Sequence, residues 1–484
     1  MAHNLAQALP EIDALPLCVD LDGTLLKIDS LFEATISTTL ADWRNLLRLP
    51  FWLTRGRAHL KHEIAERWSF NPAHLPYNED LLAFLRNEHM RGRRIVMTTA
   101  ADESIAQPIA HHLGIFDEVI SSDGVNNLRG ATKAEALCRR FGKGGFVYAG
   151  NDATDHAVWR DAAGAVVVAA SAAVKRTALA HYPVTAVLDR PGGGLFALVK
   201  ALRPYQWVKN LLVFVPLFGA GDISNITAWQ NTLAIMAAFC AMASAIYLLN
   251  DMGDLAADRA HPRKRNRPFA SGRLSVLTGL MMVPLLGATA VLLGIWSGGL
   301  IGLLVYAGLS LAYTFRLKEM PLIDVFVLAG LYTIRMYGGS EASGYGLSLW
   351  LLGFSGFMFL SLALVKRVSE LARLRSASQK KTDRRGYLVE DLSTLQMFGI
   401  STTFASAVVL SLYVQSATAS SLYRRPELLI GLIPLFMFWQ CRLWLSTARG
   451  YMHDDPIVYA ARDWVSWCVF LLTGALVFAA KLPV

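Results

Sequence analysis

The distribution of apolar and polar positions changes near Leu195. Before residue 190, charged side chains occur at ordinary density between short apolar runs, whereas beyond Leu195 long uncharged runs alternate with short, strongly charged segments. Such alternation is typical of membrane-spanning helices joined by loops. The pattern predicts a soluble domain over 1–190, a linker over 191–202 and an all-α polytopic membrane domain over 203–484.

Several apolar runs approach the ~20 residues that a helix needs to cross a bilayer. We expect about nine spans. The runs are 205–221, 228–249, 276–296, 299–315, 321–337, 346–365, 396–416, 427–446 and 464–482.

Lys and Arg concentrate in alternate connections, chiefly 250–274 and 366–395, while 219–227, 297–299 and 338–345 contain neither. The pair Arg424–Arg425 breaks this pattern. The positive-inside rule then places the N-terminal domain and the basic loops on the cytoplasmic side of a bacterial inner membrane, and nine spans place the C-terminus outside. The first residues lack the apolar core of a signal peptide, which agrees with this orientation.

The composition narrows the classes of protein to which the chain could belong. The chain is 54% hydrophobic and 17% charged, with a net charge of +9. Its basic residues lie in loops between apolar runs, so membrane orientation explains them better than nucleic-acid binding does. Five cysteines without CxxC spacing indicate neither a disulfide framework nor a cysteine metal site.

The most informative motif of the soluble domain is LPLCVDLDGTLL (15–26), an apolar strand that runs into Asp20 and Asp22. Two carboxylates at this spacing suit phosphoryl transfer, because one can attack phosphorus while the other moves a proton. Three further elements follow in order. These are RRIVMTTAAD (93–102), ATKAEAL (131–137) and GGFVYAGNDATDHAVW (144–159).

This order of motifs resembles the haloacid dehalogenase (HAD) superfamily of hydrolases. The resemblance implies a Rossmannoid α/β domain with a small helical cap over 30–85. It implies that Asp20 is the nucleophile and Asp22 the general acid/base. Thr99 and Lys133 would hold phosphoryl oxygens, and Mg²⁺ would rest on Asp20, the Asp22 carbonyl, Asp152 and Asp155. Asn151 departs from the family, which usually has an acid there. The alternative is a head that has lost catalysis and regulates or scaffolds.

The most informative motif of the membrane domain follows an apolar run at its cytoplasmic end. Asn250 precedes Asp251, Asp254 and Asp258, whose spacing of i, i+3 and i+7 predicts one helical face. Stacked carboxylates repel one another unless a cation joins them, and Mg²⁺ with a diphosphate is a natural partner. Basic residues that could contact phosphate follow. These are Arg259, Lys264, Arg265 and Arg267. A solvated charged loop is the alternative, but it does not explain the acids.

The NDxxDxxxD motif resembles the first aspartate motif of the UbiA superfamily, over about 195–484. Ordinary members carry a second acidic motif, where this chain has a single Asp324 followed by Arg335. An intramembrane arginine normally faces a polar cavity. The departure favours another branch, the decaprenyl-phosphate phosphoribosyltransferases, which RPYQWVKNLLVFVPL (203–217), residues 250–268 and ALVKRVSEL (363–371) resemble.

That branch implies 5-phosphoribosyl 1-diphosphate as donor and a polyprenyl monophosphate as acceptor. Asn250 and the three aspartates would hold Mg²⁺ on the donor diphosphate. The resemblance implies further substrate contacts from Lys209, Arg259, Lys264, Arg265, Arg267, Tyr313, Lys318, Asp324, Arg335, Lys366, Arg367 and Glu370. Two polar segments, 384–391 and 453–463, either bind a ribose hydroxyl or are solvated loops.

Together these features predict a membrane phosphoribosyltransferase whose fused head removes the 5-phosphate from the product. Two rivals remain. One is UbiA-type prenylation of an aromatic acceptor, and the other is a phosphate-gated transporter with a regulatory head. A homo-oligomer is compatible with the sequence.

Overall fold

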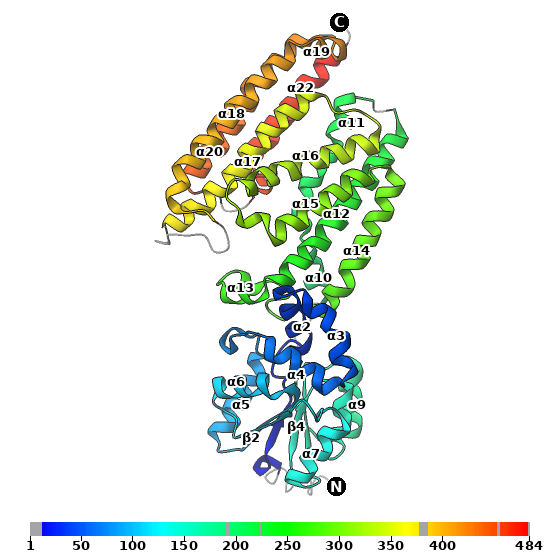
Figure 1. The fold of residues 1–484 in the computed structure, drawn as a ribbon, viewed down its shortest axis with the longest axis vertical. Coiled ribbons are helices and arrows are strands. Elements are labelled where there is room, and N and C mark those ends of the chain that lie inside the picture. Colours follow the sequence, from blue (N-terminus) through cyan, green and yellow to red (C-terminus); the bar gives the residue numbers. More distant parts are fainter. Residues whose placement is uncertain (1–11, 190–193, 223, 377–385, 453–454, 483–484) are drawn as a thin grey trace. The chain divides into compact units, whose positions relative to one another are not determined.

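The computed structural model describes most of the chain, which forms two compact units (Figure 1). The described residues are 12–189, 194–222, 224–376, 386–452 and 455–482. The first unit combines residues 1–201 with 248–281, and the second combines 202–247 with 282–484. Segment 248–281, which follows a predicted span, therefore groups with the N-terminal residues. Residues 191–193 of the expected linker lie outside the described residues.

The first unit is built on a six-stranded parallel sheet in the order β3-β2-β1-β4-β5-β6. The strands are β1 (Leu17–Val19), β2 (Ile95–Asp102), β3 (Glu118–Ser122), β4 (Val147–Gly150), β5 (Gly164–Val168) and β6 (Val184–Leu188). This confirms the expected α/β domain. The strand order reverses between β1 and β4, and ligands of such sheets bind at that switch point, beyond the carboxyl ends of the strands.

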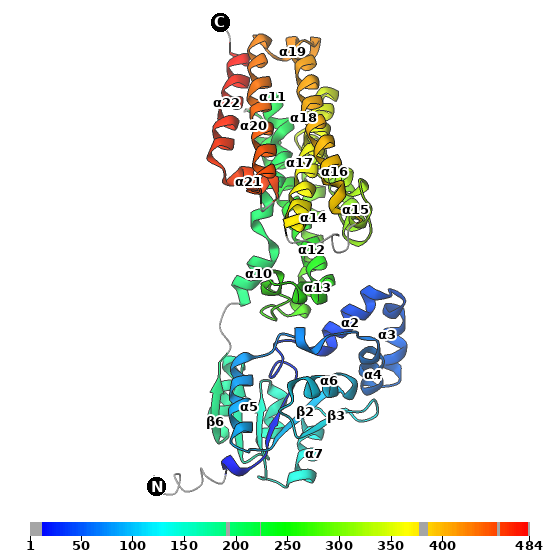
Figure 2. The ribbon, with the colours of Figure 1, turned by 90° about the vertical axis from the view of Figure 1, so that its left-hand side faces the viewer.

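Alternate residues of the strands face two separate apolar layers, visible as helices flanking the sheet (Figure 2). Leu17 and Val19 pack with α5 (Glu79–Met90) and α6 (Glu103–Leu113). Cys18 faces the layer formed by α7 (Ala131–Phe141), α8 (His156–Trp159) and α9 (Ala172–His181). Because successive strand side chains point to opposite faces, both faces of a fully covered sheet must be apolar.

Three helices occupy the insertion between β1 and the η1 turn (Pro72–His74), as expected for a small cap. They are α2 (Ser30–Ala41), α3 (Arg44–Thr54) and α4 (Arg57–Arg67). Asp29 caps α2 by accepting hydrogen bonds from the backbone N–H groups of Leu31 and Phe32. Gly56, at φ +106°, allows the turn between α3 and α4.

The second segment of the first unit starts at the end of α12 (Ile226–Gly253) and continues through α13 (Leu255–Ala260) and η4 (Lys264–Asn266) to the start of α14 (Val276–Ser297). A buried ion pair holds this segment to the cap. The Arg259 guanidinium donates to both Glu33 carboxylate oxygens at 2.7 and 2.6 Å and to the Ala270 carbonyl at 3.0 Å.

The second unit is helical. Its elements beyond α12 and α14 are η3 (Pro204–Phe214), α11 (Val215–Ala220), α15 (Leu300–Phe315), η5 (Leu317–Glu319), α16 (Ile323–Ser343), α17 (Leu349–Ser376), η6 (Val389–Asp391), α18 (Leu392–Val414), α19 (Ala417–Leu422), η7 (Pro426–Gly431), α20 (Leu432–Ala448), α21 (Pro456–Arg462) and α22 (Trp464–Lys481). The long helices α17 and α18 pack along each other, and α16 packs against α17.

Six helical segments of the described chain are long and apolar enough to cross a bilayer, so this is a multi-pass membrane protein, although the expected nine spans are only approximate. They are Ile226–Gly253, Val276–Ser297, Leu349–Arg375, Val389–Val414, Pro426–Ala448 and Trp464–Lys481. The other three predicted runs differ for identifiable reasons. Run 205–221 is broken into η3 and the short α11, α15 has only 16 residues, and α16 carries Asp324, Arg335 and Glu341.

Candidate functional sites

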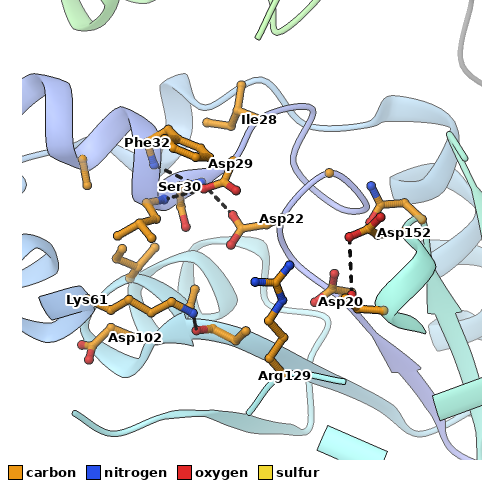
Figure 3. Close-up of a pocket in the computed structure, with 18 of the residues that line it drawn as sticks. Asp20, Asp22, Ile28, Asp29, Ser30, Phe32, Lys61, Asp102, Arg129 and Asp152 are labelled. Atoms are coloured by element: carbon orange, nitrogen blue, oxygen red, sulfur yellow. Dashed lines mark hydrogen bonds between the residues drawn. The ribbon is translucent and has the colours of Figure 1, made fainter. Parts of the chain in front are cut away.

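The carboxyl ends of β1 and β4 border a cavity of about 490 Å³ in the first unit (Figure 3). Asp20 and Asp22 line it from the loop after β1, and Asn151, Asp152 and Asp155 from the loop after β4. The cap contributes Phe32 and Lys61. The sequence motifs of the head thus meet at the switch point of the sheet.

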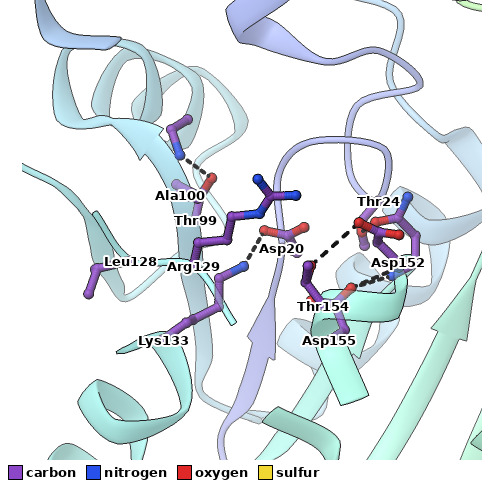
Figure 4. Close-up of polar contacts among 12 residues, drawn as sticks. Asp20, Thr24, Thr99, Ala100, Leu128, Arg129, Lys133, Asp152, Thr154 and Asp155 are labelled. Carbon is purple, nitrogen blue, oxygen red and sulfur yellow. Dashed lines mark hydrogen bonds and ion pairs between the residues drawn. The ribbon is translucent and has the colours of Figure 1, made fainter. Parts of the chain in front are cut away.

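A buried hydrogen-bond network that runs through Tyr148 ties three of the predicted residues together. Figure 4 shows the Lys133–Asp20 contact of this network. Lys133 Nζ donates to Asp20 Oδ1 at 2.7 Å and to the Tyr148 hydroxyl at 2.8 Å. The Tyr148 hydroxyl donates in turn to Asp155 Oδ1 at 3.0 Å. Asp155 Oδ2 accepts from the backbone N–H groups of Asn151 and Asp152, at 2.8 and 2.9 Å. Asp155 therefore shapes the loop after β4, and Tyr148, which no sequence spacing indicated, links Lys133 to Asp155.

The two aspartates of the first motif differ in their surroundings. Burial raises the pKa of Asp20 to about 6, against the attraction of Lys133. Asp22 Oδ1 accepts from the Ser30 N–H at 2.8 Å, and burial together with the charge of Asp29 raises its pKa to about 7. A carboxyl that titrates near neutral pH can give and take a proton, which is what a general acid/base needs.

Asn151, at the position where the family usually has an acid, packs into the turn after β1. Its Oδ1 accepts from the Thr24 hydroxyl at 3.1 Å. Gly23 has φ +72°, and a Cβ there would collide with the Asn151 side-chain amide, so only glycine fits the turn. Asp152 is exposed and caps the η2 turn (Ala153–Asp155) through the Ala153 N–H.

Two cationic side chains that line this cavity, Arg129 and Lys61, were not indicated by any sequence motif. In Figure 3 the Arg129 guanidinium lies between Asp20 and Asp22. Lys61 of α4 donates to the Ala100 carbonyl at 2.8 Å and to Asn127 Oδ1 at 2.9 Å. The predicted Thr99 is fully buried at β2, where its hydroxyl oxygen accepts from the Ala101 N–H at 3.0 Å.

The aspartate motif of segment 248–281 is held by an arginine from the same segment. Arg267 Nη1 donates to Asp251 Oδ1 at 3.1 Å and to Asp258 Oδ2 at 2.6 Å. Burial raises the pKa of Asp258, while Arg267 opposes that shift. The expected single helical face is interrupted, because α12 ends at Gly253 and α13 begins at Leu255. Asp258 still reaches Asp251 through their shared arginine.

The other predicted residues of this segment are placed differently from one another. Arg259 is buried against Glu33, whereas Lys264 and Arg265 are exposed on η4. Asn250 lies in the last turn of α12 and Asp254 in the bend between α12 and α13. Glu33, the partner of Arg259, stands far away in the sequence, and nothing in its spacing identified it.

In the second unit, buried Asp455 gathers two predicted lysines. Lys209 Nζ donates to Asp455 Oδ2 at 2.6 Å and Lys366 Nζ to the same atom at 3.4 Å. The Tyr332 hydroxyl lies 3.5 Å from Asp455 Oδ1. Although burial favours the neutral acid, the two lysines hold the pKa of Asp455 below its ordinary value. Asp455 belongs to the polar segment 453–463, of which 453–454 lie outside the described residues, as do 384–385 of the other polar segment.

Asp324 is paired with an arginine rather than with a second acid. Arg367 donates through Nε to Asp324 at 2.5 Å, through Nη1 to Glu370 at 2.5 Å and through Nη2 to the Tyr313 hydroxyl at 2.9 Å. The Tyr387 hydroxyl donates to the other Asp324 oxygen at 2.5 Å. The structure thus joins four predicted residues, Tyr313, Asp324, Arg367 and Glu370, into one network, and Lys318 lies on η5.

Arg335 forms a third polar cluster inside the helical unit. It donates to Asn210 Oδ1 at 2.8 Å, to the Tyr306 hydroxyl at 3.2 Å and to the Leu331 carbonyl. None of these three acceptors is an acid, and a guanidinium has five N–H donors.

Both aspartate sites suit Mg²⁺ by donor chemistry. Among the described residues, no three His, Cys, Asp or Glu side chains are arranged as a ready-made metal site. Mg²⁺ is usually held by one or two carboxylates together with substrate phosphates, so a complete protein cage is not required. Asp20 with the Asn151 and Asp152 loop, and Asp251 with Asp258, provide such hard oxygen donors.

Comparison with known families agrees with this division of the chain. The profile of the UbiA prenyltransferase family matches residues 212–454, and that of haloacid dehalogenase-like hydrolases matches residues 17–160. A Sinorhizobium fredii protein, "Uncharacterized protein y4nM", is 38% identical over 472 residues, covering 96% of this chain and 90% of that protein.

A relative whose name states an activity aligns with a smaller part of this chain. A decaprenyl-phosphate phosphoribosyltransferase from Mycobacterium tuberculosis is 34% identical over 234 residues, which is 46% of this chain and 75% of that enzyme. Among solved structures, a UbiA homolog from Archaeoglobus fulgidus bound to GPP and Mg²⁺ aligns with a TM-score of 0.47 and 15% identity, covering 59% of this chain and 99% of that one.

Proposed function

Since the chain belongs to the UbiA prenyltransferase family and carries a HAD-like hydrolase domain, we propose that it transfers 5-phosphoribose from phosphoribosyl diphosphate to a polyprenyl phosphate. The observation that carries this proposal is the pairing of Asp324 with Arg367 and Tyr387, where ordinary family members have a second acidic motif. Ordinary members carry two acidic motifs for a prenyl diphosphate, and a chain with only the first of them is less suited to that donor. The named phosphoribosyltransferase relatives support the same choice.

We propose that Asn250, Asp251, Asp254 and Asp258 bind the donor diphosphate through Mg²⁺. When bound, the metal would neutralise the leaving diphosphate. Arg267 holds Asp251 and Asp258 together before the donor arrives, and its guanidinium can then turn to phosphate oxygens. Lys264 and Arg265, exposed on η4, are further phosphate contacts in this scheme.

The reaction needs little proton transfer. A phosphate oxygen of the polyprenyl phosphate forms a bond to C1 of ribose, and the bond from C1 to the diphosphate breaks with its electron pair leaving on diphosphate. An anionic phosphate is already a nucleophile, so positioning and charge stabilisation carry the rate. Lys209 and Lys366, held by Asp455, and Arg335 are the cations of the second unit that we assign to phosphate binding.

We assign the remaining polar residues of the second unit to shaping that binding region. Arg367 orients Asp324, Tyr313 and Glu370 at once, and Lys318 adds a nearby positive charge on η5. Arg259 stabilises the first unit through Glu33 rather than touching substrate, because its guanidinium is buried in that pair.

We further propose that the head removes the 5-phosphate from the lipid-linked product. Asp20 attacks phosphorus, Asp22 protonates the departing ribose oxygen, and water then cleaves the aspartyl-phosphate to release inorganic phosphate. Lys133 orients Asp20. Arg129 and Lys61 bring positive charge to the cavity for an anionic substrate. Mg²⁺ at Asp20, the Asp22 carbonyl and the Asn151–Asp152 loop would neutralise phosphoryl charge. We propose that the head lies on the cytoplasmic side of a bacterial inner membrane, which the distribution of Lys and Arg among the loops supports.

Donor choice tests the proposal against its rival. The purified chain in lipid nanodiscs is given Mg²⁺ with phosphoribosyl diphosphate or with geranyl diphosphate, and thermal unfolding is followed. We expect stabilisation by the phosphoribosyl compound and transfer of its label to decaprenyl phosphate. Stabilisation by geranyl diphosphate alone would favour prenylation. Stabilisation by neither, with phosphate-dependent flux in proteoliposomes, would favour the transporter.

A further inference from the structure

The cap helix α3 combines cations with large exposed apolar side chains. Its sequence, RNLLRLPFWLT, contains no acid. Trp43 and Leu47 are each 67% exposed, and Leu46 and Phe51 are also exposed. Trp43, Leu46, Leu47 and Phe51 follow the spacing of one helical face. Asn45 and Trp52 point inward and are buried, so this apolar face is the outer face of the cap.

The cations of the same region are exposed as well. They are Arg44, Arg48, Arg55 and Arg57. Helices with a cationic border and an outward Trp, Phe and Leu face typically lie in the interface of an anionic bilayer, with the apolar side chains inserted. Tryptophan in particular favours the headgroup level. Arg44, Arg48 and Arg55 form a row along one edge of the apolar face. An apolar soluble partner would not by itself explain this row, whereas lipid phosphates complement it.

The position of α3 within the first unit puts a bilayer within reach. Leu40, at the end of α2 just before α3, lies 3.4 Å from where a Cβ of Gly253 would be. Gly253 ends α12, one of the membrane-spanning candidates. The buried Glu33–Arg259 pair fixes α2 to the segment that follows α12. The cap is therefore fastened to the chain where that chain leaves the membrane.

The cavity of the head lies beside the same boundary. Ser275 lines it, and the next residue, Val276, begins α14, a second membrane-spanning candidate. Leu31, Phe32 and Ile64 of the cap add apolar surface to the cavity wall. A substrate that keeps its chain in the bilayer can present its phosphate here, next to Asp20.

We propose that α3 docks on the anionic bilayer surface and that the head consequently acts on phosphate monoesters of membrane-embedded lipids in preference to soluble esters. The docking does not depend on the proposed function. The substrate preference rests on the proposed phosphatase activity, which is tested separately below.

Docking is measured on the full chain in nanodiscs of phosphatidylethanolamine and phosphatidylglycerol. Cys138, Cys441 and Cys468 are replaced by serine, and Leu47→Cys is labelled with the fluorophore NBD. The control is Met90→Cys, an exposed apolar position at the end of α5, just before the amino end of β2, whereas the cavity lies at the carboxyl ends of the strands. We expect emission of the Leu47 probe to shift to shorter wavelength and to be quenched by doxyl-labelled lipid, and the Met90 probe to show neither.

Two results overturn docking. Water-like emission from the Leu47 probe would mean that α3 faces solvent. A shift to shorter wavelength without quenching by doxyl lipid would mean that protein, such as a second copy of the chain, covers α3.

The substrate preference is measured with one headgroup in two forms, soluble ribose 5-phosphate and decaprenyl-phosphate-linked ribose 5-phosphate in nanodiscs. In the double variant Leu47→Glu with Phe51→Glu, the rate of phosphate release from the lipid form should fall by about tenfold or more. A tenfold change corresponds to about 1.4 kcal/mol, and burying these two side chains in the bilayer contributes at least that much. Release from 4-nitrophenyl phosphate should stay unchanged, and Met90→Glu should alter neither activity.

Unchanged release from the lipid form in the double variant would overturn the preference, as would faster wild-type turnover of soluble ribose 5-phosphate. If the wild type releases no phosphate from any ester, the proposed phosphatase function fails, whereas the fluorescence result still decides whether α3 docks.

Discussion

Two pairs of aspartates in the first unit show opposite ways of burying acids. In the cavity of the head, Asp20 is paired with Lys133 while Asp22 accepts a backbone N–H, and burial leaves both with raised pKa values, about 6 and about 7. In segment 248–281, Asp251 and Asp258 share one arginine, Arg267. In the first pair, Asp22 has a pKa near neutral that suits the proton transfer we propose for it, and Asp20 is held by Lys133 as the proposed nucleophile. In the second pair, we propose that a diphosphate with Mg²⁺ would take the place of Arg267.

We expect the largest effect from substituting Asp20, in the first pair of aspartates. Asp20→Asn removes the attacking carboxylate, so phosphate release from 4-nitrophenyl phosphate should fall by about 10⁴-fold or more, as for other nucleophile deletions. Ribosyl transfer should not change. Asp80→Asn, an exposed acid in the first turn of α5, serves as the control and should behave like the wild type. A variant that keeps a tenth of the phosphatase activity would exclude Asp20 as nucleophile.

We expect the next largest effect from substituting Asp251, in the second pair of aspartates. Asp251→Asn removes a charge that the proposal assigns to the donor diphosphate, and ribosyl transfer to decaprenyl phosphate should fall by about 1,000-fold, in the range for losing one electrostatic contact to a transition state. Hydrolysis of 4-nitrophenyl phosphate should persist. Glu427→Gln on η7 is the matched exposed control. Transfer within twofold of the wild type would remove the aspartate motif from the mechanism.

A smaller effect is expected from the pair that joins the cap to segment 248–281. Arg259→Gln leaves Glu33 buried without its charge partner, which should destabilise the first unit by about 3 kcal/mol. Hydrogen exchange of the α2 amides should rise accordingly. The double variant Arg259→Met with Glu33→Leu should recover most of that stability, because neither charge is then buried. Equal protection of α2 in the wild type and Arg259→Gln would show that the pair does not hold the cap.

The smallest effect concerns the residue at which the head departs from its family. Asn151→Asp restores an acid beside the cavity and should lower the Mg²⁺ concentration needed for half-maximal phosphate release by about tenfold, as for other changes near metal ligands. Titration of Mg²⁺ against activity measures this shift. The same or weaker metal dependence would indicate that Asn151 serves only to pack the turn at Gly23.

Sequence reasoning identified the head well because its chemistry is local. The strand ending in Asp20 and Asp22, and the loop after β4, are contiguous motifs, and a parallel sheet brings their carboxyl ends together. Lys61 and Arg129 carried no such signal, since the cap and the turn before α7 determine where their side chains point. Tyr148 lies inside the apolar strand β4, and the sequence pattern did not indicate that its hydroxyl takes part in the network.

The membrane domain was harder to predict. Length and apolarity identify six spans in the described chain. Helix α15 is short, and Asp324 and Arg335 interrupt the run of apolar residues in α16, so a rule based on ~20 apolar residues does not count these two helices. The acidic partners of the buried arginines could not be predicted from the sequence either. Arg259 and Arg367 stand in similarly basic sequence, yet the first bonds to Glu33 and the second to Asp324, and only tertiary contacts separate them.

We propose that the two aspartate sites act in succession on one lipid. To test this, the purified chain in nanodiscs is given decaprenyl phosphate and phosphoribosyl diphosphate labelled in ribose, and the wild type is compared with Asp20→Asn. We predict that the wild type yields lipid-linked ribose and free phosphate, whereas Asp20→Asn accumulates lipid-linked ribose 5-phosphate. Identical lipid-linked ribose 5-phosphate from both proteins, with no phosphate released, would show that the two sites do not act in succession.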